Sequence, residues 1–181
     1  PDVIEGHNIF NFDLNYLEVR CRRHKVPFAI GRGGRLAQSR ASQLAIGDRT
    51  VRYRRYDIYG RNVVDTYFDI SKRDIESYGL KFLAKYFGVV SENRTYVAGG
   101  DITSMYDSSP EVLEAYCLDD VRETDAISRI MTPSWFYQAN QVPTSYQNCI
   151  LRGNASRVDM MLCAEYVRRG MALPTPRFPW L

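Results

Sequence analysis

The sequence is poor in the residues that build zinc sites and disulfide frameworks. Its 181 residues include four cysteines and two histidines, and no two cysteines have C-x-x-C spacing. Both kinds of site draw on closely spaced Cys and His, so neither is expected here. The four thiols are expected to be free and buried, as is usual in a reducing cytoplasm, and the chain is accordingly expected to be cytoplasmic.

Long apolar runs are also lacking. No uninterrupted run approaches the roughly 20 residues that a membrane helix needs, so no membrane partner is expected. The first residue is Pro1 and no secretory signal follows it, so we expect a piece of a longer chain. Apolar residues as a whole are plentiful, because 45% of the chain is hydrophobic, which suffices for the core of an ordinary domain.

Acidic residues are nearly missing from one stretch. Residues 20–61 hold eleven Arg and one Lys against Asp48 and Asp57, a net charge of +10, whereas the remainder sums to −7. Guanidinium groups form forked hydrogen bonds to phosphate oxygens, so this stretch favours contact with a nucleic acid backbone. An Arg-rich surface that only aids solubility is the alternative, and charge alone does not decide between them.

Periodicity predicts an α/β domain followed by a helical extension. The domain is expected over residues 1–131 and the extension, a helical linker, over 132–181. The expected elements are a strand over 2–6, a helix over 13–25, a twisted β-hairpin within 27–59, a strand over 61–65, and helices over 80–87 and 110–131, with a loop over 89–109. Pro110 and Thr132-Pro133 delimit the long helix, and Gly153 interrupts the last helical part. The sheet has too few strands and is expected to lack its beginning.

Three aspartates fall at element ends or on the long helix: Asp13, Asp65 and Asp120. With so few His and Cys, any metal chemistry would rest on carboxylates, which suit Mg²⁺ or Mn²⁺. Converging carboxylates that hold two such ions are the arrangement used to hydrolyse phosphodiesters. Tyr116 lies one helical turn before Asp120, so the two share a face. We expect that face to lie next to a buried apolar stripe, Leu113, Cys117 and Val121.

The Y-x-x-x-D spacing alone is weak evidence. Tyr53 and Asp57 share it, but in a strand the two side chains would lie roughly 13 Å apart, too far to serve one water. Tyr116 could equally be a core tyrosine. Asp120 could equally be a surface carboxylate that pairs with Arg122 or with an arginine elsewhere.

Longer runs carry a resemblance to a known family. The run Gly6-His7-Asn8-Ile9-Phe10-Asn11-Phe12-Asp13 resembles the second exonuclease motif of B-family DNA polymerases, and Tyr116-Cys117-Leu118-Asp119-Asp120 resembles the third. The segments over 59–67, 77–80, 141–146 and 152–154 resemble later parts of the same region, up to the start of the polymerase palm. The resemblance covers essentially the whole chain, in order.

The resemblance implies a 3′–5′ proofreading exonuclease with a ribonuclease-H-like fold, an inserted β-hairpin and a C-terminal helical extension. By position, Asp13 and Asp120 would be metal ligands, and Tyr116 would orient the attacking water, which makes these three the catalytic set. Asn8 and Phe12 would shape the pocket for the 3′-terminal nucleotide, although Phe12 could instead be core packing. Asp65 could support the site from behind or merely cap its strand, and it is not placed in the catalytic set.

One family motif is missing. The first exonuclease motif, D-x-E on the opening strand, has no counterpart in the chain, so the fold is expected to lack its first strands. Two ligands of the complete two-ion Mg²⁺ or Mn²⁺ site are therefore missing, and we expect the fragment to be weakly active or inactive. A dimer that covers the exposed sheet edges is expected.

The resemblance also gives the hairpin a role. In the family it helps to separate the primer end from the template, so Arg52, Arg54 and Arg55 would contact phosphates and Tyr53 would stack on bases. The expected partners are DNA, as a single-stranded 3′ end or primer-template, and the rest of the polymerase chain. The chain is expected to be associated with the nucleoid if its source is bacterial or archaeal. The competing interpretation is a non-catalytic nucleic-acid-binding module with a decayed exonuclease fold. A stand-alone repair exonuclease is disfavoured by the region after residue 132.

Overall fold

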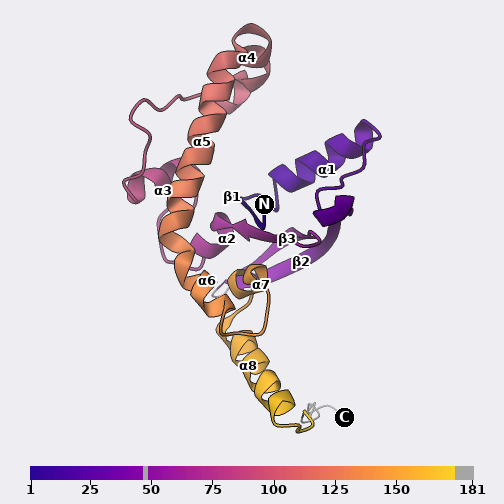
Figure 1. Ribbon diagram of the computed structural model, residues 1–181. Coiled ribbons are helices and arrows are strands. Elements are labelled where there is room, and N and C mark those ends of the chain that lie inside the picture. Colours follow the sequence, from indigo (N-terminus) through magenta and orange to yellow (C-terminus); the bar gives the residue numbers. More distant parts are fainter. Residues whose placement is uncertain (47–48, 174–181) are drawn as a thin grey trace. The chain divides into compact units, whose positions relative to one another are not determined.

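The computed structural model describes residues 1–46 and 49–173, which fall into one unit over Pro1–Pro133 and a second that begins at Ser134 (Figure 1). The first unit is an α/β domain. Its strands are β1 (Val3–Gly6), β2 (Gln38–Ile46), β3 (Arg49–Asp57) and β4 (Asn62–Asp65). Its helices are α1 (Asp13–Arg23), α2 (Thr66–Ile70), α3 (Leu80–Tyr86), α4 (Ile102–Ser108) and α5 (Pro110–Met131), with 3₁₀ turns at Arg32–Gly34 and Gly99–Asp101.

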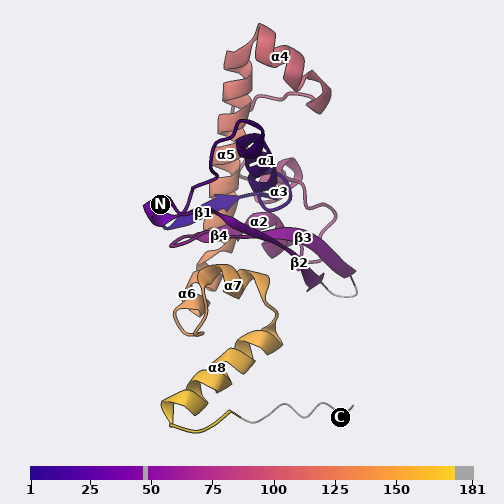
Figure 2. The ribbon, with the colours of Figure 1, turned by 90° about the vertical axis from the view of Figure 1, so that its right-hand side faces the viewer.

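Two small sheets organise the first unit. β1 and β4 pair in parallel, with Ile4 opposite Val63, and β2 and β3 pair antiparallel over their whole length (Figure 2). Val63 and Val64 are buried, as expected for a strand covered on both faces. The short strand and the Arg-rich antiparallel pair are therefore where the sequence pattern places them.

Aromatic residues join the two sheets. The ring centroid of Phe10, in the loop after β1, lies 5.6 Å from that of Tyr53 on β3 and 6.0 Å from that of Phe68 on α2. Tyr53 and Phe68 are 4.6 Å apart. This cluster fixes the loop after β1 against β3 and α2.

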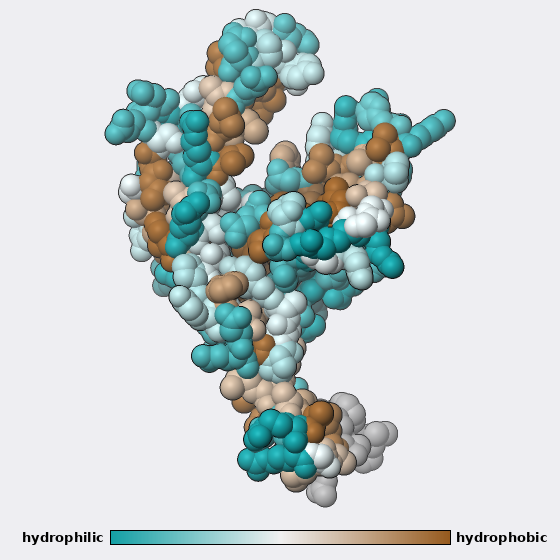
Figure 3. Space-filling view, viewed as in Figure 1, coloured by the Kyte–Doolittle hydropathy of each residue, from teal (hydrophilic) through white to brown (hydrophobic). Residues whose placement is uncertain are grey.

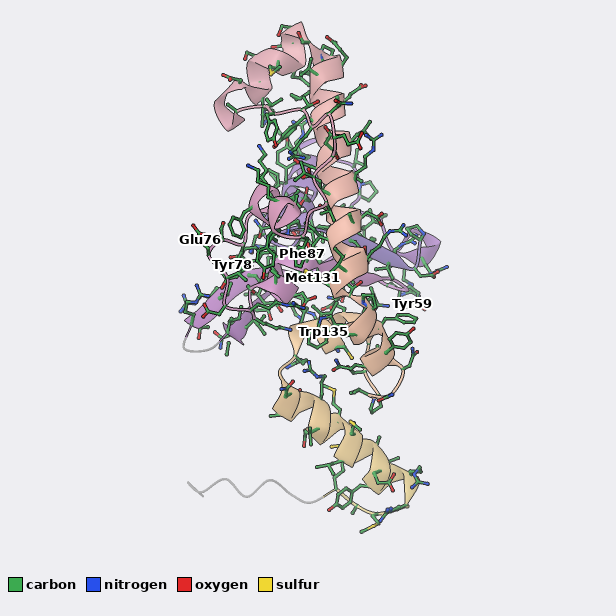
Figure 4. All side chains as sticks on the ribbon, turned by 90° about the vertical axis from the view of Figure 1, so that its left-hand side faces the viewer. Tyr59, Glu76, Tyr78, Phe87, Met131 and Trp135 are labelled. Carbon is green, nitrogen blue, oxygen red and sulfur yellow. The ribbon has the colours of Figure 1, made fainter. Side chains whose placement is uncertain are left out.

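The second core lies between α3 and α5, where Ile70, Leu83, Ala84, Ile127 and Met131 are buried together. Figure 4 shows Phe87 beside Met131 at this contact, and Phe87 packs against the cluster. α3 ends before Gly88, whose φ of +68° is one that glycine adopts without strain.

Three expectations about the fold are wrong. The segment over 89–109 contains the 3₁₀ turn and α4, and α2 was not predicted. The buried face of α5 consists of Asp119, Glu123, Ile127, Ser128 and Met131, while Cys117 and Val121 are exposed. The four cysteines are free, but only Cys149 is buried.

The second unit contains α7 (Tyr146–Leu151) and α8 (Asn154–Arg168), and α6 (Pro133–Ala139) begins at the unit boundary. The buried guanidinium of Arg157 donates to the carbonyl oxygens of Cys149 and Arg152 at 2.8 and 2.7 Å. It also lies 4.8 Å from the ring centroid of Trp135, the indole labelled in Figure 4. In the described part of the chain, no helix is both long and apolar enough to cross a membrane.

Candidate active site

A cleft of about 820 Å³ opens between the β1–α1 loop and α5. In Figure 3 the first unit is hollowed between these elements, with apolar and polar surface on its walls. Its lining includes all five residues that the sequence predicts for catalysis and for binding the nucleotide: Asn8, Phe12, Asp13, Tyr116 and Asp120. The fold therefore brings together residues that lie more than a hundred positions apart.

The β1–α1 loop is shaped by close packing and by one carboxylate. A Cβ on Gly6 would lie 2.8 Å from Cβ of Ile9, so only glycine fits there, and Asn8 has the left-handed φ of +63°. The carboxylate of Asp65 accepts hydrogen bonds from the backbone N–H of Asn8 at 2.8 Å and of Phe10 at 3.1 Å. Asp65 thus holds the loop that presents Asn8 to the cleft.

Asp65 also caps α2, because its side chain accepts the N–H of Tyr67 at 3.0 Å. It is 1% exposed. Burial raises its pKa to about 7, against the lowering effect of its three N–H donors, and the charge of Asp13 raises it further. The sequence left open whether Asp65 supports the site or caps its strand; its side chain binds the β1–α1 loop and caps α2 instead of the strand.

His7 is a site residue that the sequence reasoning missed. Its Nε2 lies 2.8 Å from the carbonyl oxygen of Tyr78, the residue labelled in Figure 4, and its Nδ1 lies 2.9 Å from Oγ1 of Thr66. Burial lowers the pKa of His7, so the neutral ring donates from Nε2 and accepts at Nδ1. The ring joins the cleft loop to α2 and to the segment before α3.

Asp13 and Phe12 lie at the start of α1. Partial burial raises the pKa of Asp13 above its ordinary value. Phe12 is 65% exposed and stacks on Tyr16 with ring centroids 6.4 Å apart. The alternative of Phe12 as a core residue is therefore wrong, and its ring is available to a ligand in the cleft.

Arg94 is the second residue that sequence reasoning missed. Its side chain is 3% exposed, and its guanidinium lies 2.6 Å from Oδ1 of Asp120 and 2.6 Å from Oε2 of Glu123. Burial alone would lower the pKa of Arg94, but the hydrogen bond to Asp120 and the charge of Glu123 raise it. Asp120 is therefore paired with an arginine elsewhere in the chain, as one alternative foresaw, and it still lines the cleft.

The neighbouring carboxylate has a different partner. Asp119 accepts the backbone N–H of Thr95 at 2.9 Å and pairs with Arg122 at 3.5 Å. The two adjacent aspartates of α5 thus both bind the segment that carries Arg94. Asp119 binds the backbone N–H of Thr95, and Asp120 binds the guanidinium of Arg94. No spacing rule in the sequence announces this contact, because Arg94 lies 26 positions before Asp120 in irregular chain.

The residues of this chain do not complete a divalent-ion site. Asp13 and Asp120 supply the hard oxygen ligands that Mg²⁺ and Mn²⁺ prefer. Within residues 1–46 and 49–173, however, no three His, Cys, Asp or Glu side chains are grouped so that they could hold a metal ion. Asp120 Oδ1 is moreover engaged by Arg94. Neither ion of the expected pair can therefore be assigned to a site made from these residues alone.

The hairpin offers fewer contacts than its sequence suggests. Arg52 and Arg54 are exposed on β3, whereas Tyr53 is buried and Arg55, with a side chain 8% exposed, pairs with Asp57 at 2.8 Å. Tyr53 packs in the aromatic cluster, so neither it nor Arg55 is available to a strand in this structure. Of the four residues predicted to bind DNA, Arg52 and Arg54 are therefore accessible, and Tyr53 and Arg55 are not.

Known proteins resemble the chain along nearly its whole length. Residues 1–83 match the family described as DNA polymerase family B, exonuclease domain. The DNA polymerase of Archaeoglobus fulgidus is 26% identical over 97% of the chain, and the DNA polymerase delta catalytic subunit of Bos taurus is 27% identical over 96%. The family B DNA polymerase structure from the hyperthermophilic archaeon Pyrobaculum calidifontis superposes with a TM-score of 0.76 at 26% identity and covers 98% of the chain.

The chain is similar to family B DNA polymerases along nearly its whole length. Residues 1–83 match the exonuclease domain of that family, as the motif around Asp13 predicted. The chain spans only about a fifth of its relatives: 21% of the Archaeoglobus polymerase, 16% of the bovine subunit and 22% of the Pyrobaculum chain. The activity of a complete family B polymerase is therefore a proposal for this polypeptide.

Proposed function

We propose that this segment forms part of a 3′–5′ proofreading exonuclease, which hydrolyses the 3′-terminal phosphodiester of DNA within a family B polymerase. The observation that carries the proposal is the single cleft lined by Asn8, Phe12 and Asp13 on one side and by Tyr116 and Asp120 on the other. An exposed aromatic ring, a tyrosine and two carboxylates thus line the same cleft. This set of groups suits a nucleotide base, its phosphate and a water molecule.

Each residue has a proposed role in this activity. Phe12 and Asn8 bind the terminal nucleotide, Tyr116 orients the attacking water, and Asp13 and Asp120 are carboxylate ligands. Family B exonuclease domains generally use divalent ions, which lower the pKa of a bound water. The two ions, Mg²⁺ or Mn²⁺, would require further ligands from outside the described residues, as a ribonuclease-H-like sheet with additional strands would provide.

Degradation of an end-labelled single strand tests the function. The natural full-length protein is expected to release nucleotides from the 3′ end in the presence of Mg²⁺. The Asp120→Ala substitution is expected to reduce the rate of this release by at least about a hundredfold. Asp125→Ala is the matched control, because Asp125 lines the same cleft from α5 but pairs with Arg129. Equal rates for the two variants would contradict the role of Asp120.

A second candidate is a non-catalytic module that binds single strands. The Arg94–Asp120 ion pair favours it, because a carboxylate neutralised by arginine needs no metal to be stable. If the natural protein binds strands in the cleft without degrading them, this candidate is the better one. Binding without hydrolysis thus separates the two functions.

The remaining assignments are also proposals. We propose that the second unit is a helical link toward the polymerase palm and that the hairpin is an insertion in the exonuclease fold. We also propose that the protein is located in the cytoplasm or nucleoid. Within the described chain β1 pairs with β4 alone, so a second copy of this polypeptide could add to its edge. Light scattering that gives a monomeric mass would contradict this dimer.

The hairpin gives a prediction of its own. Replacing Arg52 and Arg54 with Ser is expected to weaken single-strand binding and to reduce the dependence of log affinity on log salt by about 1.4, since each phosphate contact contributes about 0.7. Fluorescence anisotropy at several salt concentrations measures it. Arg40→Ser is the control, because Arg40 lies on the other strand of the hairpin and pairs with Asp57 at 3.2 Å, more closely than Arg54 pairs with Glu18 at 3.7 Å. An unchanged slope in the double variant would show that the strand does not use this face.

A further inference from the structure

One cation at the rim of the cleft has no role in the proposed catalysis. Lys81 is the second residue of α3, next to Leu80, which lines the cleft. Its Nζ lies 5.1 Å from the ring centroid of Tyr116 and 5.6 Å from that of Tyr96. The ammonium is thus placed by two aromatic rings, one of which belongs to the cleft itself.

The charges around these rings are not equivalent. Arg94 lies over the same two rings, at 6.0 Å from Tyr116 and 5.2 Å from Tyr96, but its charge is compensated by Asp120 and Glu123. Lys81 is exposed, and no described carboxylate forms an ion pair with it. Lys81 is therefore the uncompensated positive charge beside Tyr116.

Tyr96 adds an aromatic ring that is still largely exposed. Its side chain is 58% exposed, although its neighbour Val97 is buried and Thr95 is bound through its N–H by Asp119. The backbone on both sides of Tyr96 is therefore fixed while the ring remains open to solvent. A fixed, exposed ring beside a free ammonium is a combination that binds the base and the phosphate of a single-stranded nucleotide.

We propose that Lys81 and Tyr96 form a second nucleotide subsite at the rim of the cleft, next to the pocket for the 3′-terminal nucleotide. Lys81 contacts a phosphate of the entering strand, and Tyr96 stacks on an adjacent base. This subsite rests on the proposed function, because its ligand is a strand whose 3′ end lies in the cleft. It extends the binding surface from Phe12 and Asn8 across Tyr116 to α3.

The phosphate contact is tested by anisotropy with a labelled oligothymidylate in EDTA, so that no hydrolysis occurs. Lys81→Met is expected to weaken binding about fivefold at low salt and to lower the salt slope by about 0.7. Lys81→Arg is expected to leave both the affinity and the salt slope unchanged. Lys85→Met is the matched control, since Lys85 is an exposed lysine on the same helix and is expected to change neither. Equal effects of Lys81→Met and Lys85→Met would overturn the phosphate contact.

The stacking contact is tested with an abasic strand. Tyr96→Leu is expected to weaken binding of the ordinary strand by about tenfold, in line with the loss of one base–aromatic stack. A series of strands then carries one abasic site, placed in turn at each of the last nucleotides. At one of these positions Tyr96→Leu is expected to cause no further loss of affinity, because the base that stacks on Tyr96 is already missing. A loss that persists at every abasic position would overturn stacking by Tyr96.

A circular single strand separates this subsite from the proposed function. Circular strands have no 3′ end, so their affinity is expected to be insensitive to Lys81→Met while still depending on Arg52 and Arg54. If Phe12→Ala weakens binding of linear strands and Lys81→Met does not, the cleft binds DNA but the second subsite is wrong. If the wild-type chain shows no preference for linear over circular strands, the proposed function fails and the subsite with it.

Discussion

Replacing Arg94 with methionine is expected to lower the free energy of unfolding by about 3–5 kcal/mol. The guanidinium is the counter-charge of Glu123, a side chain that is 0% exposed and whose carboxylate oxygens make no hydrogen bond in the described part of the chain. Removing the arginine leaves that carboxylate buried without a cation, which costs far more than an exposed ion pair contributes. Urea denaturation followed by circular dichroism measures the change.

Arg122→Met is the matched control. Arg122 also pairs with a carboxylate of α5, but its side chain is 69% exposed and its distance to Asp119 is 3.5 Å. Its loss is expected to change stability by no more than about 1 kcal/mol. If the Arg94 variant is destabilised no more than the Arg122 variant, Glu123 has another partner and the ion pair is unimportant. The double variant Arg94→Met with Glu123→Gln is expected to recover part of the loss, because a neutral amide is cheaper to bury.

The consequence for the site follows from the position of Arg94. Its ion pair with Asp120 and the bond from Thr95 to Asp119 are two attachments of the segment before α4 to α5. Loss of the guanidinium is therefore expected to loosen this segment and to free the carboxylate of Asp120. Faster amide exchange at Thr95 and Tyr96 than in the Arg122 variant would report that local opening.

The long helix shows both what the sequence could predict and where it failed. Pro110 at the first position and the Thr132-Pro133 break gave the bounds of α5 correctly. The buried face was wrong because two rows with a four-residue spacing run along this helix, one apolar and one containing Asp119, Glu123 and Ile127. Hydrophobicity alone predicts that the apolar row is the buried one. Glu123 of the second row is buried because Arg94, far away in the sequence, neutralises it, and Asp119 is buried with the N–H of Thr95 as its partner.

The predicted exposure of Arg55 on the hairpin was wrong for a similar reason. Alternation along β3 predicts two faces, and Arg52 and Arg54 do lie on the exposed one. Arg55 departs from the rule that arginines are exposed because its guanidinium pairs with Asp57 two residues away on the same strand. The cleft residues were found through the two family motifs. His7 lies inside the first of them, but its contacts with Thr66 and Tyr78 are tertiary, and Arg94 lies in neither motif.

The carboxyl group of Asp65 is expected to make stability fall as the pH rises from about 4 to about 7. Burial raises its pKa from 3.8 to about 7 in the folded chain, so between these values the folded state holds a proton that the unfolded state has lost. The unfolded state then binds fewer protons, and the free energy of unfolding decreases as the pH rises. Three pKa units correspond to a loss of up to roughly 4 kcal/mol, complete above about pH 7.

Asp65→Asn removes this dependence, because an amide does not titrate. The variant is expected to be less stable than the wild type at pH 4, since one of the N–H donors of Asn8, Phe10 and Tyr67 loses its partner, and the difference is expected to shrink toward pH 7. Asp74→Asn, at an exposed aspartate, is expected to run parallel to the wild type throughout. Urea denaturation at pH steps from 4 to 8 gives the three curves. A wild-type curve parallel to that of Asp65→Asn would mean that Asp65 is ionised over the whole range, with its three N–H donors outweighing its burial.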